Sequence, residues 1–335
     1  MKTVIIGAGS WGTALSVVLN DAGHDVILWA REPEIADSIN RENRNQFYLP
    51  HLTLAPAIKA NLNIRECIKD RNFIVFATPS HAIRSVAEKI KPMLTGDEII
   101  VNVAKGIEQE SFLTPTQILS EVLGDVINED HIGVLYGPSH AEEVCEKKPT
   151  TVVSAANSKS TAKLIQQVFS TSRFRVYVNH DMLGVEIAGS VKNVIAIAAG
   201  ACDGAGLGDN AVAALLTRGL IEIKRLGMKL GASSDTFSGL AGIGDMIVTC
   251  TSKHSRNRFV GYEIGKGKKL DEIIKDMNMV AEGVKTTQSV YGMAQKLGVE
   301  MPITEAVYRV LFENVPPDVA VSQLMTRDLK DEIII

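Results

Sequence analysis

A single lysine lies in an apolar segment whose composition favours a buried helix. In residues 185–199 the only charged side chains are those of Glu186 and Lys192. Burial disfavours the ammonium form and lowers the pKa of a lysine toward neutrality, where the amine can accept a proton. Glu186 is six positions away, about 240° around a helix, so it is not a local ion-pair partner. The segment predicts either a general base or a lysine whose stem packs while its head reaches water.

An aspartate and a threonine follow a glycine-rich segment further along the chain. Three glycines in residues 238–244 lead into Asp245 at the expected start of a helix, and Thr249 lies on the same helical face four residues later. An N-cap explains an aspartate at a helix start. It does not explain the polar neighbour, so Asp245 is also a candidate to orient a catalytic base, as acid partners commonly do.

A compact cationic cluster comes next. Residues 253–258 read Lys-His-Ser-Arg-Asn-Arg in a chain whose formal net charge is −4. A solvated helix face accounts for part of this cluster. Arg256 beside Asn257 is also suited to a phosphate, because a guanidinium donates two parallel charge-assisted hydrogen bonds to such an anion.

The first residues have the pattern of a nucleotide-binding turn. A buried-strand pattern at 4–6 runs into a G-x-G-x-x-G turn formed by Gly7, Gly9 and Gly12, and a helix-compatible run follows at 13–19. The first glycine permits the tight turn, the second lets a pyrophosphate approach the backbone, and the third allows the helix to pack closely on the strand. The helix N-terminus supplies N–H donors. We therefore expect dinucleotide binding.

The end of the second expected strand bears on the choice of cofactor. The fingerprint usually places an acid there to hold the ribose 2′-hydroxyl, but the strand at 26–29 is followed by Ala30, Arg31 and Glu32. Arg31 stands where a 2′-phosphate would lie, which favours NADP over NAD. Glu32 can still serve a 2′-hydroxyl, so both cofactors stay possible.

Strand and helix patterns alternate through the first half of the chain. The further strand patterns are at 73–77, 99–103, 132–135, 151–153 and 175–178. Near-continuous apolar strands separated by helices predict an α/β fold with a Rossmann-like, doubly wound, mostly parallel sheet. Ligands of such sheets bind beyond the carboxyl ends of the strands. The candidates there are Lys105 for an anion, Gly137 for close backbone approach and Ser139 as a donor, although Thr-Pro-Ser and Gly-Pro-Ser are also ordinary turn sequences.

The second half of the chain changes character. From about Val185 it is rich in alanine and leucine with helical spacing and has almost no strand pattern. At 335 residues the chain is long enough for two domains, a dinucleotide-binding Rossmann-type domain at 1–184 and an all-helical substrate and catalytic domain at 185–335. Asp209 is expected to cap the helix that follows it.

Composition and charge argue against several classes of function. A net acidic chain without a basic stripe is not expected to bind nucleic acid. The cysteines are widely spaced, at Cys67, Cys145, Cys202 and Cys250, so we expect buried thiols in a reducing cytoplasm. The seven histidines show no metal-ligand spacing, so we expect no metal. The uninterrupted apolar runs are far shorter than the ~20 residues that span a bilayer, so neither a membrane span nor a signal peptide is expected.

Six motifs, taken in order, resemble the NAD(P)-dependent sn-glycerol-3-phosphate dehydrogenases of the bacterial type. They are Gly7-x-Gly9-Ser10-Trp11-Gly12-Thr13-Ala14, Ala104-Lys105-Gly106, Gly137-Pro138-Ser139-His140-Ala141, Lys192-Asn193, Asp245-Met246-Ile247-Val248-Thr249 and Ser255-Arg256-Asn257. The resemblance covers nearly the whole chain. It implies reversible reduction of dihydroxyacetone phosphate to sn-glycerol 3-phosphate for phospholipid synthesis, with NADPH or NADH. It also implies a Rossmann-type N-terminal domain, an all-helical C-terminal domain and commonly a homodimer.

The resemblance also implies roles for individual residues. Lys192 is the expected proton acceptor for the substrate C2 hydroxyl, with Asp245, Thr249 and Lys105 as the other catalytic candidates. The expected substrate positions are Lys105, Gly137, Ser139, Lys192, Asp245, Ser255, Arg256 and Asn257. The expected cofactor positions are Gly7, Gly9, Ser10, Trp11, Gly12, Arg31, Tyr48, Lys105, Ala141, Arg256, Val280 and Glu282, of which Tyr48 is the weaker match. The tail at 331–335 has no place in this pattern.

Two other functions stay open. Another dehydrogenase built on the same two-domain plan, acting on a hydroxy acid or a sugar acid, would also need a lysine on the interdomain helix, but it would need a carboxylate-binding site. A non-catalytic NADP-sensing module would need the glycine turn but not Lys192 and Asp245. Oxidation of reduced cofactor in the presence of dihydroxyacetone phosphate distinguishes these functions.

Overall fold

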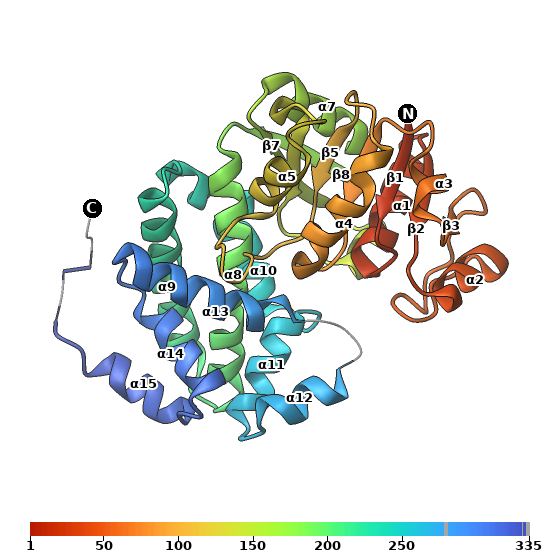
Figure 1. The fold of residues 1–335 in the computed structure, drawn as a ribbon. Helices are drawn as coiled ribbons and strands as arrows, with labels where there is room; N and C mark the ends of the chain where they lie inside the picture. The colour runs from red at the N-terminus through yellow and green to blue at the C-terminus, as the bar shows by residue number, and fades with distance from the viewer. Residues whose placement is uncertain (278–280, 330, 333–335) are drawn as a thin grey trace.

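The structure is a computed structural model and describes residues 1–277, 281–329 and 331–332. In Figure 1 the segment coloured red to yellow-green forms a sheet covered by helices, and the green to blue segment forms a helical body beside it. The predicted fold class, a Rossmann-like and mostly parallel sheet followed by a helical region, is confirmed.

The sheet has eight strands in the order β3-β2-β1-β4-β5-β6-β7-β8. The strands are β1 Lys2–Ile6, β2 Asp25–Trp29, β3 Lys59–Asn61, β4 Phe73–Phe76, β5 Ile99–Asn102, β6 Ile132–Tyr136, β7 Thr150–Ala156 and β8 Phe174–Asn179. Neighbours pair in parallel except β6 and β7, which are antiparallel. Each strand expected from the sequence is present. The edge strand β3 was not expected, because its Lys-Ala-Asn sequence lacks the β-branched and aromatic residues that mark a strand.

Helices cover both faces of the sheet. They are α1 Ser10–Asp21, α2 Pro33–Glu42, α3 Ile64–Ile68, α4 Ile83–Ile90, α5 Pro115–Leu123, α6 Ala141–Cys145 and α7 Lys159–Phe169, with short 3-10 turns at η1 Ser80–Ala82, η2 Lys91–Met93 and η3 Glu129–His131. Successive residues of one strand enter different cores. Val4 and Ile74 belong to one buried cluster, while Ile5 and Val75 belong to the cluster on the other side. This alternation is what a sheet buried on both faces requires.

The helical region is built around α8. Its elements are α8 Met182–Gly204, α9 Asp209–Lys229, η4 Ser234–Ser238, η5 Leu240–Gly244, α10 Asp245–Thr251, α11 Arg256–Gly265, α12 Leu270–Asp276, α13 Glu282–Leu297, α14 Pro302–Phe312 and α15 Pro317–Met325. Helices α9, α10, α11 and α13 all contact α8. Strand β8 ends three residues before α8 begins, so the expected domain boundary between 184 and 185 falls in the first turn of α8 and stays a prediction.

Helix α8 is long and apolar enough to cross a membrane by length and composition, and it is the single such helix in the part of the chain that the structure describes. Because Glu186 and Lys192 interrupt its sequence, this helix has no long uninterrupted apolar run. Its most apolar window is 94% buried inside the protein, so this apolar surface forms the centre of the helical core.

Helices α8 and α11 touch backbone to backbone through glycines. A Cβ on Gly200 or Gly204 of α8 would lie within 2.1 Å of a backbone oxygen of α11, and a Cβ on Gly261 or Gly265 of α11 would lie within 2.4 Å of one of α8. No side chain fits in these places, so the two helices are in direct contact over a full turn.

The N-terminus of α9 differs from the sequence expectation. Gly208 is the N-cap, with φ +82°, and Asp209 is the first helical residue. The expected Asp209 cap is therefore wrong, because the chain enters the helix in a conformation that glycine adopts readily and aspartate does not. Asp209 instead places a negative charge in the first turn, where the helix dipole favours it.

Candidate active site

Two lysines share the two oxygens of one carboxylate. Lys192 Nζ lies 2.7 Å from Asp245 Oδ1, and Lys105 Nζ lies 2.6 Å from Asp245 Oδ2. Lys192 comes from the middle of α8, Asp245 from the first turn of α10, and Lys105 from the segment that follows β5. Lys192 and Asp245 are 4% and 1% exposed. The head of Lys192 therefore does not reach water, and the snorkelling alternative is wrong.

Thr249 lies one helical turn after Asp245 and completes the contacts of Lys192. Its hydroxyl donates to the backbone oxygen of Asp245 at 2.6 Å and accepts a hydrogen bond from Lys192 Nζ. Asp245 follows directly on η5, and Gly244 already has helical backbone angles. The N-cap interpretation of Asp245 is therefore wrong, and its side chain serves the lysines.

The electrostatics of the cluster bring the pKa of Lys192 closer to neutrality. Burial lowers the pKa of Lys192 from 10.5 to about 8; Asp245 opposes this effect and the charge of Lys105 adds to it. Desolvation thus outweighs the ion pair. An amine with such a pKa exchanges its proton near neutral pH, as a general base must.

Gly137 and Ser139 lie on the other side of Lys105. The carbonyl oxygen of Gly137 accepts from Lys105 Nζ at 3.1 Å and from Ser139 Oγ at 3.0 Å. Gly137 has φ +142°, and a Cβ there would lie 2.9 Å from Val152 Cα. Gly137 thus lets the backbone of β7 come close, and the expected approach of a ligand to Gly137 stays a prediction. These contacts form one connected cluster, made of Lys105, Gly137, Ser139, Lys192, Asp245 and Thr249.

The glycine turn has the geometry of a dinucleotide site. Gly7 has φ +119°, and a Cβ on it would lie 2.7 Å from the carbonyl oxygen of Ala77. A Cβ on Gly12 would lie 1.9 Å from the oxygen of Gly7, whereas a Cβ on Gly9 would meet no atom of the described residues within 4 Å. Helix α1 begins at Ser10 and has no side-chain cap at Gly9. Open space at Gly9 beside a helix N-terminus fits a pyrophosphate.

Asn45 supports this turn and is not among the residues expected from the sequence. It is fully buried, and its Nδ2 donates to the oxygen of Ala8 at 2.8 Å and to Thr13 Oγ1 at 2.9 Å. Its Oδ1 accepts from the backbone N–H of Tyr48 at 3.3 Å, so it also positions the weaker cofactor candidate. Asn45 lies outside regular helices and strands, where no periodicity marks a buried side chain.

The remaining cofactor candidates of the sheet domain lie near this turn or at strand ends. Trp11 and Tyr48 are half-buried against the core of the sheet, and Ala141 is the buried first residue of α6, which packs on α1. Arg31 is exposed beyond β2 and pairs with Glu32 at 2.5 Å. Exposed pairs of this kind are weak, so a phosphate can compete for the guanidinium.

Ser255, Arg256 and Asn257 form the N-terminus of α11. Ser255 is the N-cap, and its Oγ accepts from the backbone N–H of Arg258 at 3.2 Å. Asn257 is buried, and its Oδ1 accepts from the backbone N–H of Gly283 at 2.9 Å, so it ties α11 to α13. The first N–H groups of a helix attract anions, which suits the expected phosphate.

Arg256 lies between the helical region and the sheet domain. Part of its side chain is exposed, yet desolvation lowers its pKa, against the opposite influence of Glu282, Glu142 and Tyr48. These neighbours come from α13, α6 and the loop after α2. The arginine therefore faces the expected cofactor positions as well as the cluster at the start of α11.

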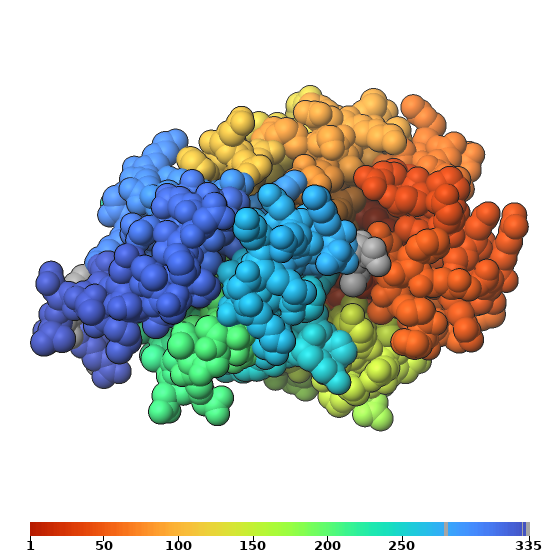
Figure 2. Space-filling model, turned by 90° about the horizontal axis from the view of Figure 1, so that it is seen from below, coloured from red at the N-terminus to blue at the C-terminus, as the bar shows by residue number. Residues whose placement is uncertain are grey.

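Glu282 joins the two parts of the molecule. It begins α13, and its carboxylate accepts from the backbone N–H of Ser80 at 3.1 Å and from the Ser80 hydroxyl. Ser80 belongs to the Thr-Pro-Ser segment after β4. The expected cofactor residue Val280 lies outside the described residues. Figure 2 shows that the surface is hollowed where the red and orange segments meet the cyan and blue helices.

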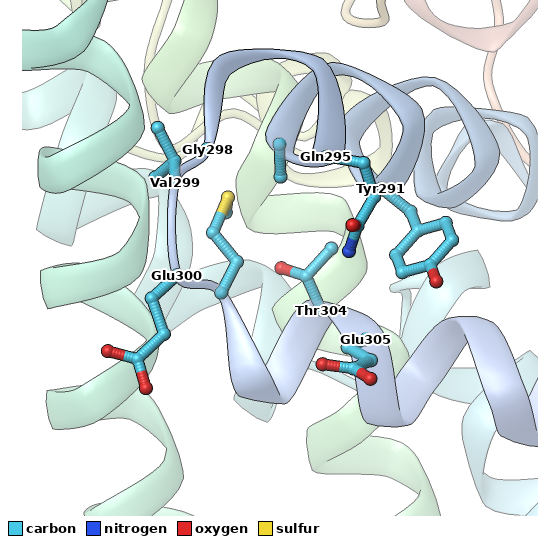
Figure 3. A pocket seen from close by; sticks show the side chains of 9 residues that line it. Tyr291, Gln295, Gly298, Val299, Glu300, Thr304 and Glu305 are labelled. Atoms are coloured by element: carbon cyan, nitrogen blue, oxygen red, sulfur yellow. The ribbon is translucent and has the colours of Figure 1, made fainter.

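The cysteines and a separate pocket are two further features. All four cysteines are buried and free, and no group of three or more metal-binding side chains occurs among the described residues. A pocket of about 280 Å³ lies between α13 and α14, where Tyr291 and Gln295 face Thr304 and Glu305 (Figure 3). None of the expected site residues lines it.

Comparison with known proteins places this geometry in a family. Residues 2–162 match the family model of the NAD-dependent glycerol-3-phosphate dehydrogenase N-terminus, and residues 181–322 match that of the C-terminus. A glycerol-3-phosphate dehydrogenase (NAD(P)+) of Salinibacter ruber is 53% identical over 98% of this chain and 96% of its own. One of Chlorobium phaeobacteroides is 51% identical over 99% of both chains. The crystal structure of the glycerol-3-phosphate dehydrogenase from Coxiella burnetii has a TM-score of 0.92 at 39% identity and covers 97% of this chain and 98% of that one.

Proposed function

Because the chain belongs to the NAD-dependent glycerol-3-phosphate dehydrogenase family, we propose that its lysine–carboxylate cluster interconverts dihydroxyacetone phosphate and sn-glycerol 3-phosphate. The protein is an NAD(P)-dependent oxidoreductase, and its product supplies phospholipid synthesis. The observation that carries the site assignment is a buried Lys192, with a pKa of about 8, bonded to Asp245 and Thr249.

Lys192 moves the proton of the reaction. When bound, NAD(P)H supplies the hydride to C2 of the ketone, and NAD(P)+ accepts it in the reverse direction. In reduction the Lys192 ammonium donates a proton to the oxygen on C2, and in oxidation the neutral amine removes the hydroxyl proton. Asp245 and Thr249 hold the amine in place. The charge of Lys105, on the other oxygen of Asp245, stabilises negative charge that develops on the substrate oxygen.

The substrate phosphate binds at the N-terminus of α11. The Arg256 guanidinium donates charge-assisted hydrogen bonds to the phosphate. Ser255 Oγ accepts from the backbone N–H of Arg258, so its hydroxyl proton is available to the phosphate. Asn257 fixes the start of α11 on α13. Gly137 and Ser139 border the substrate on the side of Lys105. Binding energy from the phosphate, which is remote from C2, positions the carbonyl for reaction.

The cofactor lies along the glycine turn. Gly9, Ser10 and the N-terminus of α1 hold the pyrophosphate, with Gly7, Trp11 and Gly12 shaping the turn. Arg31 and Tyr48 lie on the adenosine side. The nicotinamide end is assigned to Lys105, Ala141, Arg256 and Glu282. The open space at Gly9 and the uncapped start of α1 support this placement.

We also propose the wider setting of the enzyme. Residues 1–184 form the cofactor-binding domain and residues 185–335 the substrate and catalytic domain, a division supported by the end of the sheet just before α8. Four buried free thiols suit a reducing compartment such as the cytoplasm. Homodimer formation follows the resemblance to the family, and light scattering of the purified protein tests it.

A direct assay tests the function. Purified protein is mixed with NADPH or NADH and dihydroxyacetone phosphate, and cofactor absorbance is followed at neutral pH. We expect rapid oxidation with the phosphorylated ketone and slow oxidation with dihydroxyacetone or a 2-keto acid. Turnover of a keto acid in preference to the phosphorylated ketone would show that the site binds a carboxylate instead.

A further inference from the structure

Tyr136, the last residue of β6, is a fully buried aromatic that none of the roles above includes. Its hydroxyl donates to the backbone oxygen of Ala104 and accepts from Asn102 Nδ2 at 2.9 Å. Asn102 in turn bonds both the oxygen and the N–H of Ala104, at 2.9 and 3.1 Å. The phenol is thus attached to the backbone directly before Lys105.

The ring of Tyr136 lies between the two lysine-bearing segments. Lys105 Nζ is 5.6 Å from the ring centroid, within the range of a cation–π contact. The ring also packs against α8 at Gly189, where a Cβ would lie 2.5 Å from the Cδ2 atom of the ring. Gly189 precedes Lys192 by three residues, so it lies on the same side of α8.

We propose that Tyr136 is a positioning residue for the reaction: its ring holds the Lys105 ammonium against Asp245 and the Gly137 carbonyl, and its contact with Gly189 sets the separation between Lys105 and the helix that carries Lys192. This inference rests on the proposed function of the cluster. Tyr136 touches neither substrate nor cofactor in this role and acts through the two lysines.

The physical reason is the freedom that Lys105 would otherwise have. Its side chain is 19% exposed, and a lysine stem is flexible, so the ammonium can exchange Asp245 for water. The negative face of an aromatic ring opposes that movement. Burial raises the pKa of the Tyr136 hydroxyl, and the charges of Glu186, Asp245 and Glu282 add to this effect against the hydrogen bond from Asn102, so the hydroxyl stays neutral.

Displacement of Lys105 has a measurable electrostatic effect. The groups that act on Lys192 are Asp245 and Cys250 on α10, Lys105 after β5 and His140 before α6. Of these, only Lys105 is held by the Tyr136 ring. If the Lys105 charge moves away, Lys192 loses a neighbour that lowers its pKa, and its pKa rises.

The experiment compares Tyr136→Leu with Tyr136→Phe in the whole enzyme. Tyr136→Phe keeps the ring beside Lys105 and loses only the hydroxyl bonds to Ala104 and Asn102, so Tm should fall while the rising limb of the pH profile stays where it is in wild type. Tyr136→Leu removes the ring, so KM for dihydroxyacetone phosphate should rise about two- to thirty-fold, the range that cation–π strengths imply. The rising limb of kcat/KM for glycerol 3-phosphate oxidation should move roughly half to one pH unit higher.

A matched control and a second variant make the result decisive. Phe73→Leu removes a buried aromatic from β4 of the same sheet, and it should lower Tm without moving the pH profile. If Tyr136→Leu does not fold, Gly189→Ala, which displaces the ring by crowding it, should move the limb in the same direction. An unmoved limb in folded Tyr136→Leu, an equal shift in Phe73→Leu, or an equal shift in Tyr136→Phe overturns the proposal. A wild type without dihydroxyacetone phosphate activity would instead overturn the proposed function.

Discussion

Asp245 bonds two lysines that differ in burial, and that difference separates their roles. Lys192 is almost completely buried, whereas about a fifth of the Lys105 side chain is exposed. An ammonium loses more solvation at the buried position, and burial lowers the pKa of Lys192 to about 8. In the proposed mechanism Lys105 therefore provides the positive charge and Lys192 the base.

Replacement of Lys192 by methionine tests the base. Methionine keeps an apolar stem of similar length, so the fold and cofactor binding should survive while turnover falls by about 10²–10⁴-fold. In wild type the oxidation of glycerol 3-phosphate should rise with pH through about 8, as Lys192 loses its proton. Lys192→Arg should not restore activity, because arginine stays protonated. Turnover within a few-fold of wild type in either variant would contradict the mechanism.

Replacement of Arg256 by alanine tests the phosphate site. Loss of a charge-assisted hydrogen bond costs about 1.5–3 kcal/mol, so KM for dihydroxyacetone phosphate should rise by one to two powers of ten. Dihydroxyacetone should remain a poor substrate and be nearly unaffected. Steady-state kinetics with both ketones measure the difference. An equal loss with the phosphate-free ketone would show that Arg256 does not bind the phosphate.

Replacement of Arg31 by aspartate tests the choice of cofactor. The wild-type protein is expected to use NADPH at least as well as NADH, because Arg31 follows the second strand where the fingerprint usually has an acid for the ribose 2′-hydroxyl. The variant should lose far more affinity for NADPH than for NADH, because its carboxylate repels the 2′-phosphate but can accept a hydrogen bond from a ribose hydroxyl. KM values for the two cofactors measure the difference. An equal rise in both KM values would show that Arg31 does not bind the 2′-phosphate.

Among the elements, α5 and α8 are joined by a buried acid that the sequence analysis considered only as a non-partner of Lys192. The Glu186 carboxylate accepts from Thr114 Oγ1 at 2.7 Å, and from the Thr116 N–H and hydroxyl at 2.9 and 2.5 Å. Glu186 therefore provides a buried acceptor for hydrogen-bond donors at the start of α5. Burial raises the pKa of Glu186 from 4.5 to about 7, although its hydrogen bonds oppose the shift.

This acid makes stability depend on pH. The folded protein binds the Glu186 proton more tightly than the unfolded chain, so the stabilisation is complete below pH 4.5 and is lost as pH rises through about 7. Glu186→Gln stays neutral, so its unfolding free energy relative to wild type should improve by up to about 3 kcal/mol between pH 4.5 and 8. Urea unfolding at several pH values measures this. Glu88→Gln, at an exposed position of α4, should show no such trend, and a pH-independent difference for Glu186→Gln would refute the assignment.

At the scale of the whole molecule, Ser80 and Glu282 hold the sheet domain and the helical region together beside the cofactor positions. Ser80→Ala removes the hydroxyl but leaves the backbone N–H. With about 1 kcal/mol lost per hydrogen bond, KM for the cofactor should rise a few-fold while Lys192-dependent turnover changes little. Ser85→Ala, whose hydroxyl bonds only Ala82 of the neighbouring turn among the described residues, is the control. Equal effects of the two variants would argue against a joining role.

The sequence predicts the sheet, the glycine turn and the charged residues of the site, because each stands out against a regular local pattern. Lys192 is conspicuous in an apolar helix, and Gly7 to Gly12 follow a strand. The supporting residues are different. Ser80 and Glu282 are 202 positions apart, and Thr114 and Glu186 are 72 apart. Such partners are chosen by the folded chain, and neither periodicity nor spacing marks them in advance.

The glycine contacts between α8 and α11 have a consequence for selectivity by length. Helix α8 carries the proposed base and α11 begins at the proposed phosphate site, and their backbones touch with no side chains between them. The fold therefore fixes the distance between the part of α8 that carries Lys192 and the proposed phosphate site. A ketone one methylene further from its phosphate would leave its carbonyl out of register with Lys192, however the surrounding loops adjust. The ratio of kcat/KM for dihydroxyacetone phosphate and its longer homologue measures how strongly the enzyme selects substrates by length.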